Sequence, residues 1–338
     1  MKKYKIAIAG SLVLLSVLIY SLIAYCRLPG NLTHRPVVEI SIDKGTPFKA
    51  FVDSLERKGV VKHKNLFILW AKGCQFDREV PAGMFKVPVG LTYPQLITFF
   101  RQTRPEFITV TLIEGWPTEH ILRRLSKRLH LSYRKLDSLS HDSLFLRSLG
   151  IPAANITGYL LPDTYVFASG IGAKEVLRFL VQKTLRLFEP DSIKERMKTL
   201  GFNRHQVLTL ASIVEGEALL DRERPIIASV YLNRLRRGMR LQADPTIQFI
   251  IPDGPRRLRY RDLKIDSPYN TYLHKGLPPG PINNPGKKSI MAVLFAPKTK
   301  YLYFVAKGDG SHFFARTARE HARAKQKFNK IRKKVYGY

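Results

Sequence analysis

Cysteine is scarce in this chain of 338 residues, which contains only Cys26 and Cys74. Two cysteines exclude a disulfide framework and a zinc site built from several cysteines. The nine histidines show no spacing with acidic residues that would suit a metal, so we expect neither a metal nor another cofactor. The sequence also lacks internal repeats and low-complexity tracts. Its length suits two or three domains of modest size.

Acidic residues are also scarce. The chain has 26 aspartates and glutamates but 57 lysines and arginines, which gives a formal net charge of +31. Hydrophobic residues make up 45% of the chain, enough to bury real cores, so the excess charge does not indicate disorder. Such a charge points instead to a polyanionic partner, which can be a nucleic acid, an anionic membrane surface or an acidic polymer.

Charge is missing altogether from residues 6–26. About 20 apolar residues are enough for a helix to cross a bilayer. Three lysines lie in residues 1–5 and only Arg27 follows closely, so the positive-inside rule predicts a cytoplasmic tail at 1–5, a transmembrane anchor at 6–26 and the remainder outside the cytoplasm. That orientation excludes nucleic acid as the partner. A nucleic-acid partner would be possible only if residues 28–338 lay in the cytoplasm.

Two other interpretations of the apolar segment are a cleaved signal peptide and a lipoprotein signal. The apolar region of a signal peptide is usually shorter and ends at a site of small residues, whereas Tyr25 is large. The same tyrosine stands before Cys26, where a lipoprotein signal has a small residue. We therefore predict that the anchor is not cleaved.

Residues 27–36 contain proline, glycine and polar residues and are interpreted as a linker. The following residues 37–105 predict a small module of strands and helices, on the basis of strand-forming residues and helical spacing of apolar side chains. The expected elements are strands at Val37–Ile42 and Ala82–Val87 and helices at Thr46–Lys58, Asn65–Lys72 and Thr92–Arg101. This order suits a small glycan-binding module, and it equally suits a domain that only packs.

Residues 106–338 predict a second domain of mixed helices and strands, so the fold class is α+β. A strand is expected at Phe107–Ile113, helices at Lys174–Phe188 and, with a basic solvent face, at Thr317–Lys334, and a hairpin near residues 301–314. The segment 158–165 is interpreted as a loop because it combines aromatic and turn-forming residues.

The segment from Asn203 to Leu220 carries the strongest indication of chemistry. Asn203 with Gln206 forms a capping-box signature, and the apolar run that follows predicts a buried helix. Glu215 and Glu217 lie at its end. Helical spacing surrounds Glu215 with apolar residues, which would favour its protonated form, as a proton donor requires. Spacing alone does not choose between the two glutamates, and a helix that ends in solvent at Gly216 remains an alternative.

Polar and aromatic residues that suit sugar binding follow this helix. Amides, hydroxyls and aromatic rings meet the hydroxyl, acetamido and apolar faces of a sugar. The candidates for positioning a glycan are Gln242, Asp244, Tyr269, Asn270 and Tyr272, with Glu217 as a further one. Each of these residues also suits an ordinary turn.

Seven segments together closely resemble the endolytic murein transglycosylases of the YceG-like family. The segments occur in the order IEGWP (113–117), GYLLPDTY (158–165), LASIVEGEA (210–218), LNRLRRGMRLQADPT (232–246), SPYNTY (267–272), GLPPGPINNPG (276–286) and APKTKYLYFVAKGDGSHFF (296–314). Several linked motifs in one order are far more specific than any single motif. The resemblance extends over nearly the whole chain.

The resemblance implies that 37–105 is a LysM-like subdomain, that 106–338 is the catalytic domain and that Glu215 is the catalytic acid. The implied reaction is non-hydrolytic cleavage of the bond between N-acetylmuramic acid and N-acetylglucosamine in peptidoglycan, which leaves 1,6-anhydro ends and terminates growing strands. The implied location is the bacterial cytoplasmic membrane, with peptidoglycan strands, anionic lipid and peptidoglycan synthases as partners. The alternative function is a membrane-anchored scaffold that binds wall glycan without cutting it.

Overall fold

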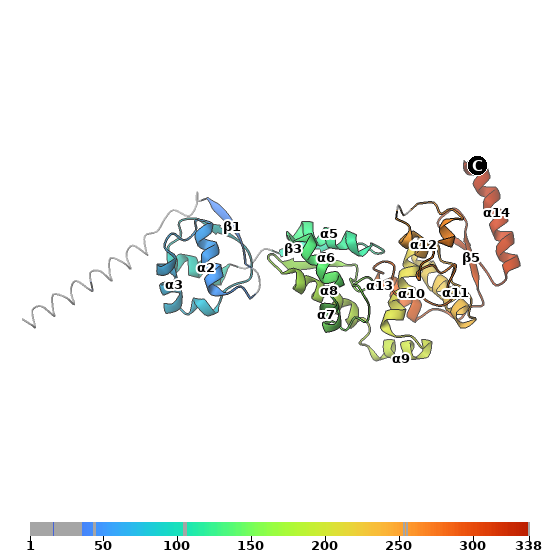
Figure 1. The fold of residues 1–338 in the computed structure, drawn as a ribbon, viewed down its shortest axis with the longest axis horizontal. Coiled ribbons are helices and arrows are strands. Elements are labelled where there is room, and N and C mark those ends of the chain that lie inside the picture. Colours follow the sequence, from blue (N-terminus) through green and yellow to red (C-terminus); the bar gives the residue numbers. More distant parts are fainter. Residues whose placement is uncertain are drawn as a thin grey trace, which may run out of the picture. The chain divides into compact units, whose positions relative to one another are not determined.

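The computed structural model describes residues 16, 36–42, 45–103, 107–252, 254 and 256–336 (Figure 1). The predicted cytoplasmic tail, all of the predicted anchor except Ser16, and the linker up to residue 35 lie outside the described residues. Among the described residues, no helix is both long enough and apolar enough to cross a membrane. The described part mixes helices with small two-stranded sheets, as the predicted α+β class requires.

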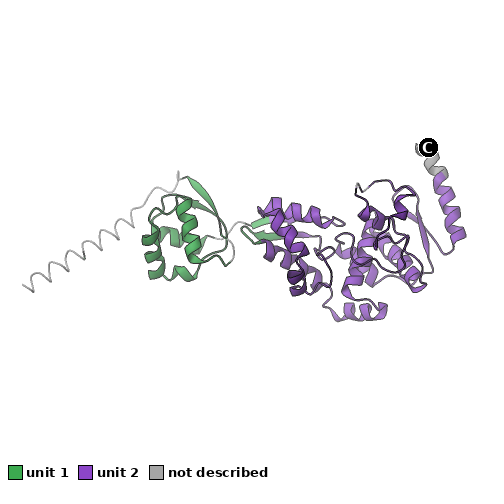
Figure 2. Cartoon of the chain, viewed as in Figure 1, with its two compact units in different colours: residues 1–108, 166–172 green, residues 109–165, 173–338 purple. Residues whose placement is uncertain are grey.

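The chain divides into two compact units (Figure 2). The first contains the residues up to Ile108 together with Val166–Gly172, and the second contains Thr109–Tyr165 and Ala173–Tyr338. The elements of the first unit are β1 (Val37–Ile42), α2 (Phe48–Arg57), α3 (Lys64–Gly73), the short 3-10 helix η2 (Phe76–Arg78), β2 (Gly83–Pro88) and α4 (Tyr93–Gln102). They follow the order that the sequence predicts.

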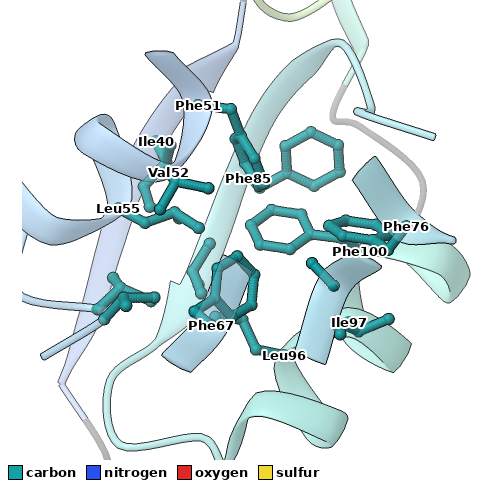
Figure 3. Close-up of a cluster of buried hydrophobic side chains, with 14 of the residues drawn as sticks. Ile40, Phe51, Val52, Leu55, Phe67, Phe76, Phe85, Leu96, Ile97 and Phe100 are labelled. Atoms are coloured by element: carbon teal, nitrogen blue, oxygen red, sulfur yellow. The ribbon is translucent and has the colours of Figure 1, made fainter. Parts of the chain in front are cut away.

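Strands β1 and β2 pair antiparallel, with Ile40 opposite Phe85. Both residues are buried because alternate positions of each strand face the same side. Phe100 of α4 lies at the centre of this core, with ring-centroid distances of 5.2 Å to Phe51 and 5.3 Å to Phe85 (Figure 3). The amphipathic pattern of the helices therefore builds one aromatic core around a single strand pair.

Helices dominate the second unit. They are α5 (Thr118–Leu129), α6 (Tyr133–His141), α7 (Ser143–Ser148), α8 (Ala173–Arg186), α9 (Asp191–Leu200), α10 (Arg204–Glu217), α11 (Arg224–Arg236), α12 (Asp244–Ile250), α13 (Lys287–Leu294) and α14 (Ala318–Tyr336), with 3-10 helices η3 (Asp221–Glu223) and η4 (Asp262–Lys264). Strands β3 (Phe107–Thr111) and β4 (Thr164–Ala168), whose residues are divided between the two units, form one sheet. In the second unit, β5 (Tyr303–Ala306) pairs antiparallel with β6 (His312–Ala315).

One prediction about the helices and strands of this unit needs correction, and two helices were missed. The segment predicted as a loop at 158–165 ends in strand β4, because its backbone pairs with β3; beside this pairing the Thr164 and Thr111 hydroxyl groups lie 2.9 Å apart. Helices α12 and α13 were not expected. Both are short, with seven and eight residues, so they show too little periodicity to be recognised from apolar spacing.

Helix α10 begins as the sequence predicts. The Asn203 side chain accepts a hydrogen bond from the Gln206 backbone amide, and the Gln206 side chain accepts one from the Asn203 amide, both at 2.9 Å. Every residue from Val207 to Val214 is buried. Helices α11 and α13 both pack against α10. This buried helix therefore holds its last turn, with Glu215 and Glu217, in a fixed position between two neighbours.

Candidate active site

Glu215 lies where three helix ends meet. It is in the last turn of α10, Arg224 is the first residue of α11, and Gly286 is the N-cap of α13. Arg224 Nη1 donates to Glu215 Oε1 at 2.8 Å, and the Gly286 amide donates to Glu215 Oε2 at 2.9 Å. The Glu215 side chain is only 5% exposed. Both carboxylate oxygens are therefore held by donors in a largely dry setting.

The apolar setting that helical spacing predicts for Glu215 describes α10 itself but leaves out a charged partner. Helical spacing gives the neighbours on α10, but Arg224 comes from the next helix and forms a buried ion pair with Glu215. Helix α10 also continues through Gly216 to Glu217, so the alternative of a helix that ends in solvent at Gly216 is wrong. A Cβ atom at Gly216 would collide with the ring of Pro245, so the absence of a side chain allows α12 to approach.

Arg224 connects several polar groups. Its side chain is 8% exposed, its Nη1 also donates to Ser289 Oγ at 2.7 Å, and its Nε donates to Asp221 Oδ1 at 3.0 Å. Asp221 pairs in addition with Lys288. The hydrogen bonds from Lys288 and Arg224 lower the pKa of the Asp221 carboxyl group. Arginine suits this position because its planar group offers several donors in fixed directions.

A second glutamate, Glu114, approaches the same arginine. Glu114 Oε2 lies 4.0 Å from Arg224 Nη2, and its side chain is 41% exposed. Partial burial and then the charge of Glu215 raise the pKa of Glu114, against the influence of Arg224 and Lys288. Glu114 comes from the segment that follows β3, which is far from α10 in sequence.

Asn284 brings that distant segment to the site. It is fully buried, and its Oδ1 accepts hydrogen bonds from the amides of Gly158 and Leu160 at 3.0 and 3.2 Å. Its Nδ2 donates to the Trp116 carbonyl at 3.1 Å and to Thr118 Oγ1 at 3.2 Å. One side chain thus joins three of the motifs on which the family resemblance rests, at 113–117, 158–165 and 276–286.

Glu217 belongs to a separate network, whose Asp244 is exposed. Tyr231 of α11 donates to Glu217 Oε1 at 2.7 Å, and Tyr272 donates to Asp244 Oδ1. Burial raises the pKa of Glu217 to about 7, although the hydrogen bond from Tyr231 acts in the opposite direction, and the charge of Asp244 raises it further. The structure therefore brings together three of the predicted residues, Glu217, Asp244 and Tyr272.

The other predicted site residues have different surroundings. Gln242 is exposed and has a left-handed backbone, with φ of 48°. The Tyr269 ring packs against Phe249, with centroids 4.9 Å apart. Asn270 is fully buried; its amide donates to the carbonyls of Leu263 and Ile265 and accepts from Tyr272. Asn270 therefore orders its own loop, and the prediction that it contacts a glycan directly needs correction.

Several functional candidates escaped the sequence reasoning. Glu114 and Gly286 lie within segments that support the family resemblance, at 113–117 and 276–286, which is a signal that could have indicated them. Arg224 and Ser289 carry no local pattern, because each acts on a residue of another helix. The sequence gives no indication of a role for Tyr231 either, since a tyrosine on a buried helix usually indicates packing alone.

A cavity of about 690 Å³ lies at the opposite end of α10 from Glu215. It is lined by residues of α8 and α9 and by the start of α10, including Arg186, Lys198, Phe202 and Arg204. Because a helix of this length extends for about 20 Å, this cavity is not part of the surroundings of Glu215.

Comparisons with known proteins agree with the resemblance. The model of the YceG-like family matches residues 40–327. An endolytic murein transglycosylase of Bacillus subtilis is 31% identical over 310 residues, which cover 87% of this chain and 85% of the relative. One of Streptococcus pneumoniae serotype 2 is 25% identical, over 90% of this chain and 60% of the relative.

A solved structure is similar as well. The crystal structure of a YceG-like protein from Listeria monocytogenes superimposes with a TM-score of 0.58 at 28% sequence identity, over 86% of this chain and 99% of that chain. Because the family model matches most of the chain and a relative exceeds 30% identity over most of both lengths, the chain belongs to the YceG-like family.

Proposed function

We propose that the protein is a lytic transglycosylase that cuts the glycan strands of peptidoglycan, with Glu215 as its catalytic residue. Family membership and two relatives named endolytic murein transglycosylase support this function. The observation that carries it is the position of Glu215, a buried carboxyl group held by Arg224 and the Gly286 amide where three helices meet. Such a fixed and largely dry carboxyl group is suited to proton transfer.

In the proposed reaction, Glu215 protonates the glycosidic oxygen between N-acetylmuramic acid and N-acetylglucosamine. The bond from that oxygen to the anomeric carbon breaks, and the acetamido group of the muramic acid stabilises the positive charge. The Glu215 carboxylate then takes the proton of the C6 hydroxyl group, whose oxygen bonds to the anomeric carbon. The result is a 1,6-anhydro ring, with no water consumed. One carboxyl group is sufficient, whereas hydrolases normally use two.

The neighbouring network is proposed to hold the glycan. Glu217, Asp244 and Tyr272 are joined by hydrogen bonds or charge coupling beside α10. Gln242 and Tyr269 are the remaining candidates, and the Gln242 side chain is exposed. Amide, hydroxyl and aromatic groups of this kind suit the acetamido and ring faces of a sugar.

The proposed cellular setting follows the sequence. Residues 6–26 would anchor the chain in the bacterial cytoplasmic membrane, with the domain at 106–338 on the outer side and the module at 37–105 as a LysM-like subdomain. The basic charge would retain the enzyme near anionic lipid and peptidoglycan. A role in terminating new strands, beside peptidoglycan synthases, suits that location.

The test compares the full-length wild-type chain with the variant Glu215→Gln on purified peptidoglycan. Glutamine keeps the shape but cannot donate and recover the proton, so the release of 1,6-anhydro ends should fall by about a thousandfold or more. Glu175→Gln, on an exposed position of α8, is the matched control. Full activity in Glu215→Gln would contradict the assignment. Release by neither the wild type nor the variant would favour the scaffold.

A further inference from the structure

Glu114 is a carboxyl group of the site to which the proposed reaction gives no task. It follows β3, and the hydrogen bonds of Asn284 to Trp116 hold its segment in place. A Cβ atom at Gly286 would collide with the Glu114 carboxyl group, so that group lies directly over Gly286. The Gly286 amide is also the donor to Glu215. The two carboxyl groups therefore both lie against one glycine.

The same two carboxyl groups also share Arg224. Its Nη1 holds Glu215 at 2.8 Å, while its Nη2 lies 4.0 Å from Glu114, about 1 Å beyond hydrogen-bond distance. A proton donor must first bind a proton, and an ion pair with Arg224 opposes that step. A second acceptor for the arginine would ease it.

We propose that Glu114 is a positioning residue that takes over Arg224 when Glu215 binds its proton, and so prepares Glu215 to act as the acid. This inference rests on the proposed function. When Glu215 is neutral, its attraction for the guanidinium group falls, and a shift of about 1 Å brings Nη2 within hydrogen-bond distance of Glu114. When Glu215 loses the proton to the glycosidic oxygen, Arg224 returns to it.

The charges around Glu215 support the exchange. On neighbouring elements they are Glu114 after β3, Asp221 in η3, Arg224 at the start of α11 and Lys288 in α13, and on α10 itself Glu217. Asp221 binds both Arg224 and Lys288. Its hydrogen bond to Nε would hold the Arg224 side chain in place while Nη2 moves toward Glu114. The charge of Glu215 contributes to the raised pKa of Glu114, which shows that the two carboxyl groups are close enough to interact.

The first test is the pH profile of anhydro-end release by the full-length chain. Removing the negative charge with Glu114→Gln should leave Glu215 more tightly held by Arg224. The alkaline limb of the profile, where activity falls as the pH rises, should move to lower pH by about one unit. Activity should then be about tenfold lower near neutrality and little changed at acidic pH. Glu114→Asp keeps the charge, so it should leave the limb near the wild-type position.

The variant Gly286→Ala tests the position of Glu114 without changing Glu114 itself. The backbone of Gly286, with φ of −71° and ψ of 162°, accepts alanine, and the added methyl group would displace the Glu114 carboxyl group while the amide donor stays. Gly286→Ala should therefore shift the limb in the same direction. If Glu114→Gln and Gly286→Ala both keep the alkaline limb of the wild type, the inference is wrong. It is also wrong if both lose activity equally at every pH, because Glu114 would then have only a structural role.

A readout without catalysis separates this inference from the proposed function. In a chain with isotope-labelled glutamate carboxyl groups, the nuclear magnetic resonance signal of Glu215, identified by its loss in Glu215→Gln, should change at lower pH in Glu114→Gln than in the wild type. An unchanged midpoint would overturn the inference even in an active enzyme. A shifted midpoint in a chain that cuts no glycan would overturn the proposed function alone.

Discussion

At the residue scale, the site depends on one buried arginine. Arg224 meets Glu215, Ser289 and Asp221 at distances of 2.7–3.0 Å, and both its side chain and that of Glu215 are less than a tenth exposed. A buried pair of this kind is costly to break, because removing one partner leaves the other charge without compensation. The same pair fixes the direction in which the Glu215 carboxyl group points.

Arg224→Met should therefore lower the free energy of unfolding by about 3–5 kcal/mol. The double variant Glu215→Gln with Arg224→Met should recover part of this loss, because no charge then stays unpaired. Urea unfolding of the wild type, both single variants and the double variant measures the coupling. As a control, Lys194→Met breaks the exposed pair with Asp191 and should change stability by less than about 1 kcal/mol. Simple additivity at Arg224 and Glu215 would contradict the ion pair.

Glu217 gives a prediction about pH. Its pKa rises from about 4.5 to about 7 on folding, mainly through burial, so the folded state holds the proton more tightly than the unfolded state. Its contribution to stability is then fully present below about pH 4.5 and is lost as the pH rises to about 7. The unfolding free energy of the wild type minus that of Glu217→Gln should therefore fall between about pH 4.5 and about pH 7, by up to about 3 kcal/mol. A difference that does not change with pH would show that Glu217 is not buried in this way.

At the element scale, Asn284 joins the segments that carry the site. It supplies hydrogen bonds to the segments at 115–118 and 158–160, while Gly286, two residues later, holds Glu215. Helices α10, α11 and α13 are placed by apolar packing, but the segment with Glu114 is placed by this amide. Hydrogen bonds therefore decide where the second carboxyl group lies.

Asn284→Ala should lower the free energy of unfolding by about 2–5 kcal/mol, because it leaves the buried amides of Gly158 and Leu160 without partners. The neighbouring Asn283→Ala is the matched control. Asn283 donates one hydrogen bond, to the Ser212 carbonyl, so its loss should be clearly smaller. Thermal and urea unfolding compare the two variants. An equal loss in both would contradict the special role of Asn284.

The elements also show what sequence patterns can predict. Helices α2, α8 and α10 were predicted within a few residues, because long apolar stripes and the Asn203 capping box give a strong local signal. Helices α12 and α13 gave no such signal, since each has eight residues or fewer. The site followed the same rule. The apolar run of α10 predicts a buried helix that ends in Glu215 and Glu217, and only the family resemblance distinguishes the two, whereas Arg224 and Glu114 reach Glu215 through tertiary packing.

At the scale of the whole molecule, the chain carries a net charge of +31, whereas the proposed reaction depends on one carboxyl group. In the proposed setting this charge would attract the chain to anionic lipid and to the carboxylates of peptidoglycan, and salt would weaken that attraction. The chemistry itself is proposed to depend on Glu215 and its immediate partners. The central claim is that this carboxyl group closes an anhydro ring without water.

Cleavage of purified glycan strands in water labelled with heavy oxygen tests that claim most directly. The full-length wild-type chain should release fragments that end in 1,6-anhydro-N-acetylmuramic acid, which are one water lighter than hydrolysis products and contain no heavy oxygen. Mass spectrometry distinguishes the two products. Fragments that carry heavy oxygen at their new reducing ends would contradict the account, because they would show that water, and not the C6 hydroxyl group, attacks the anomeric carbon.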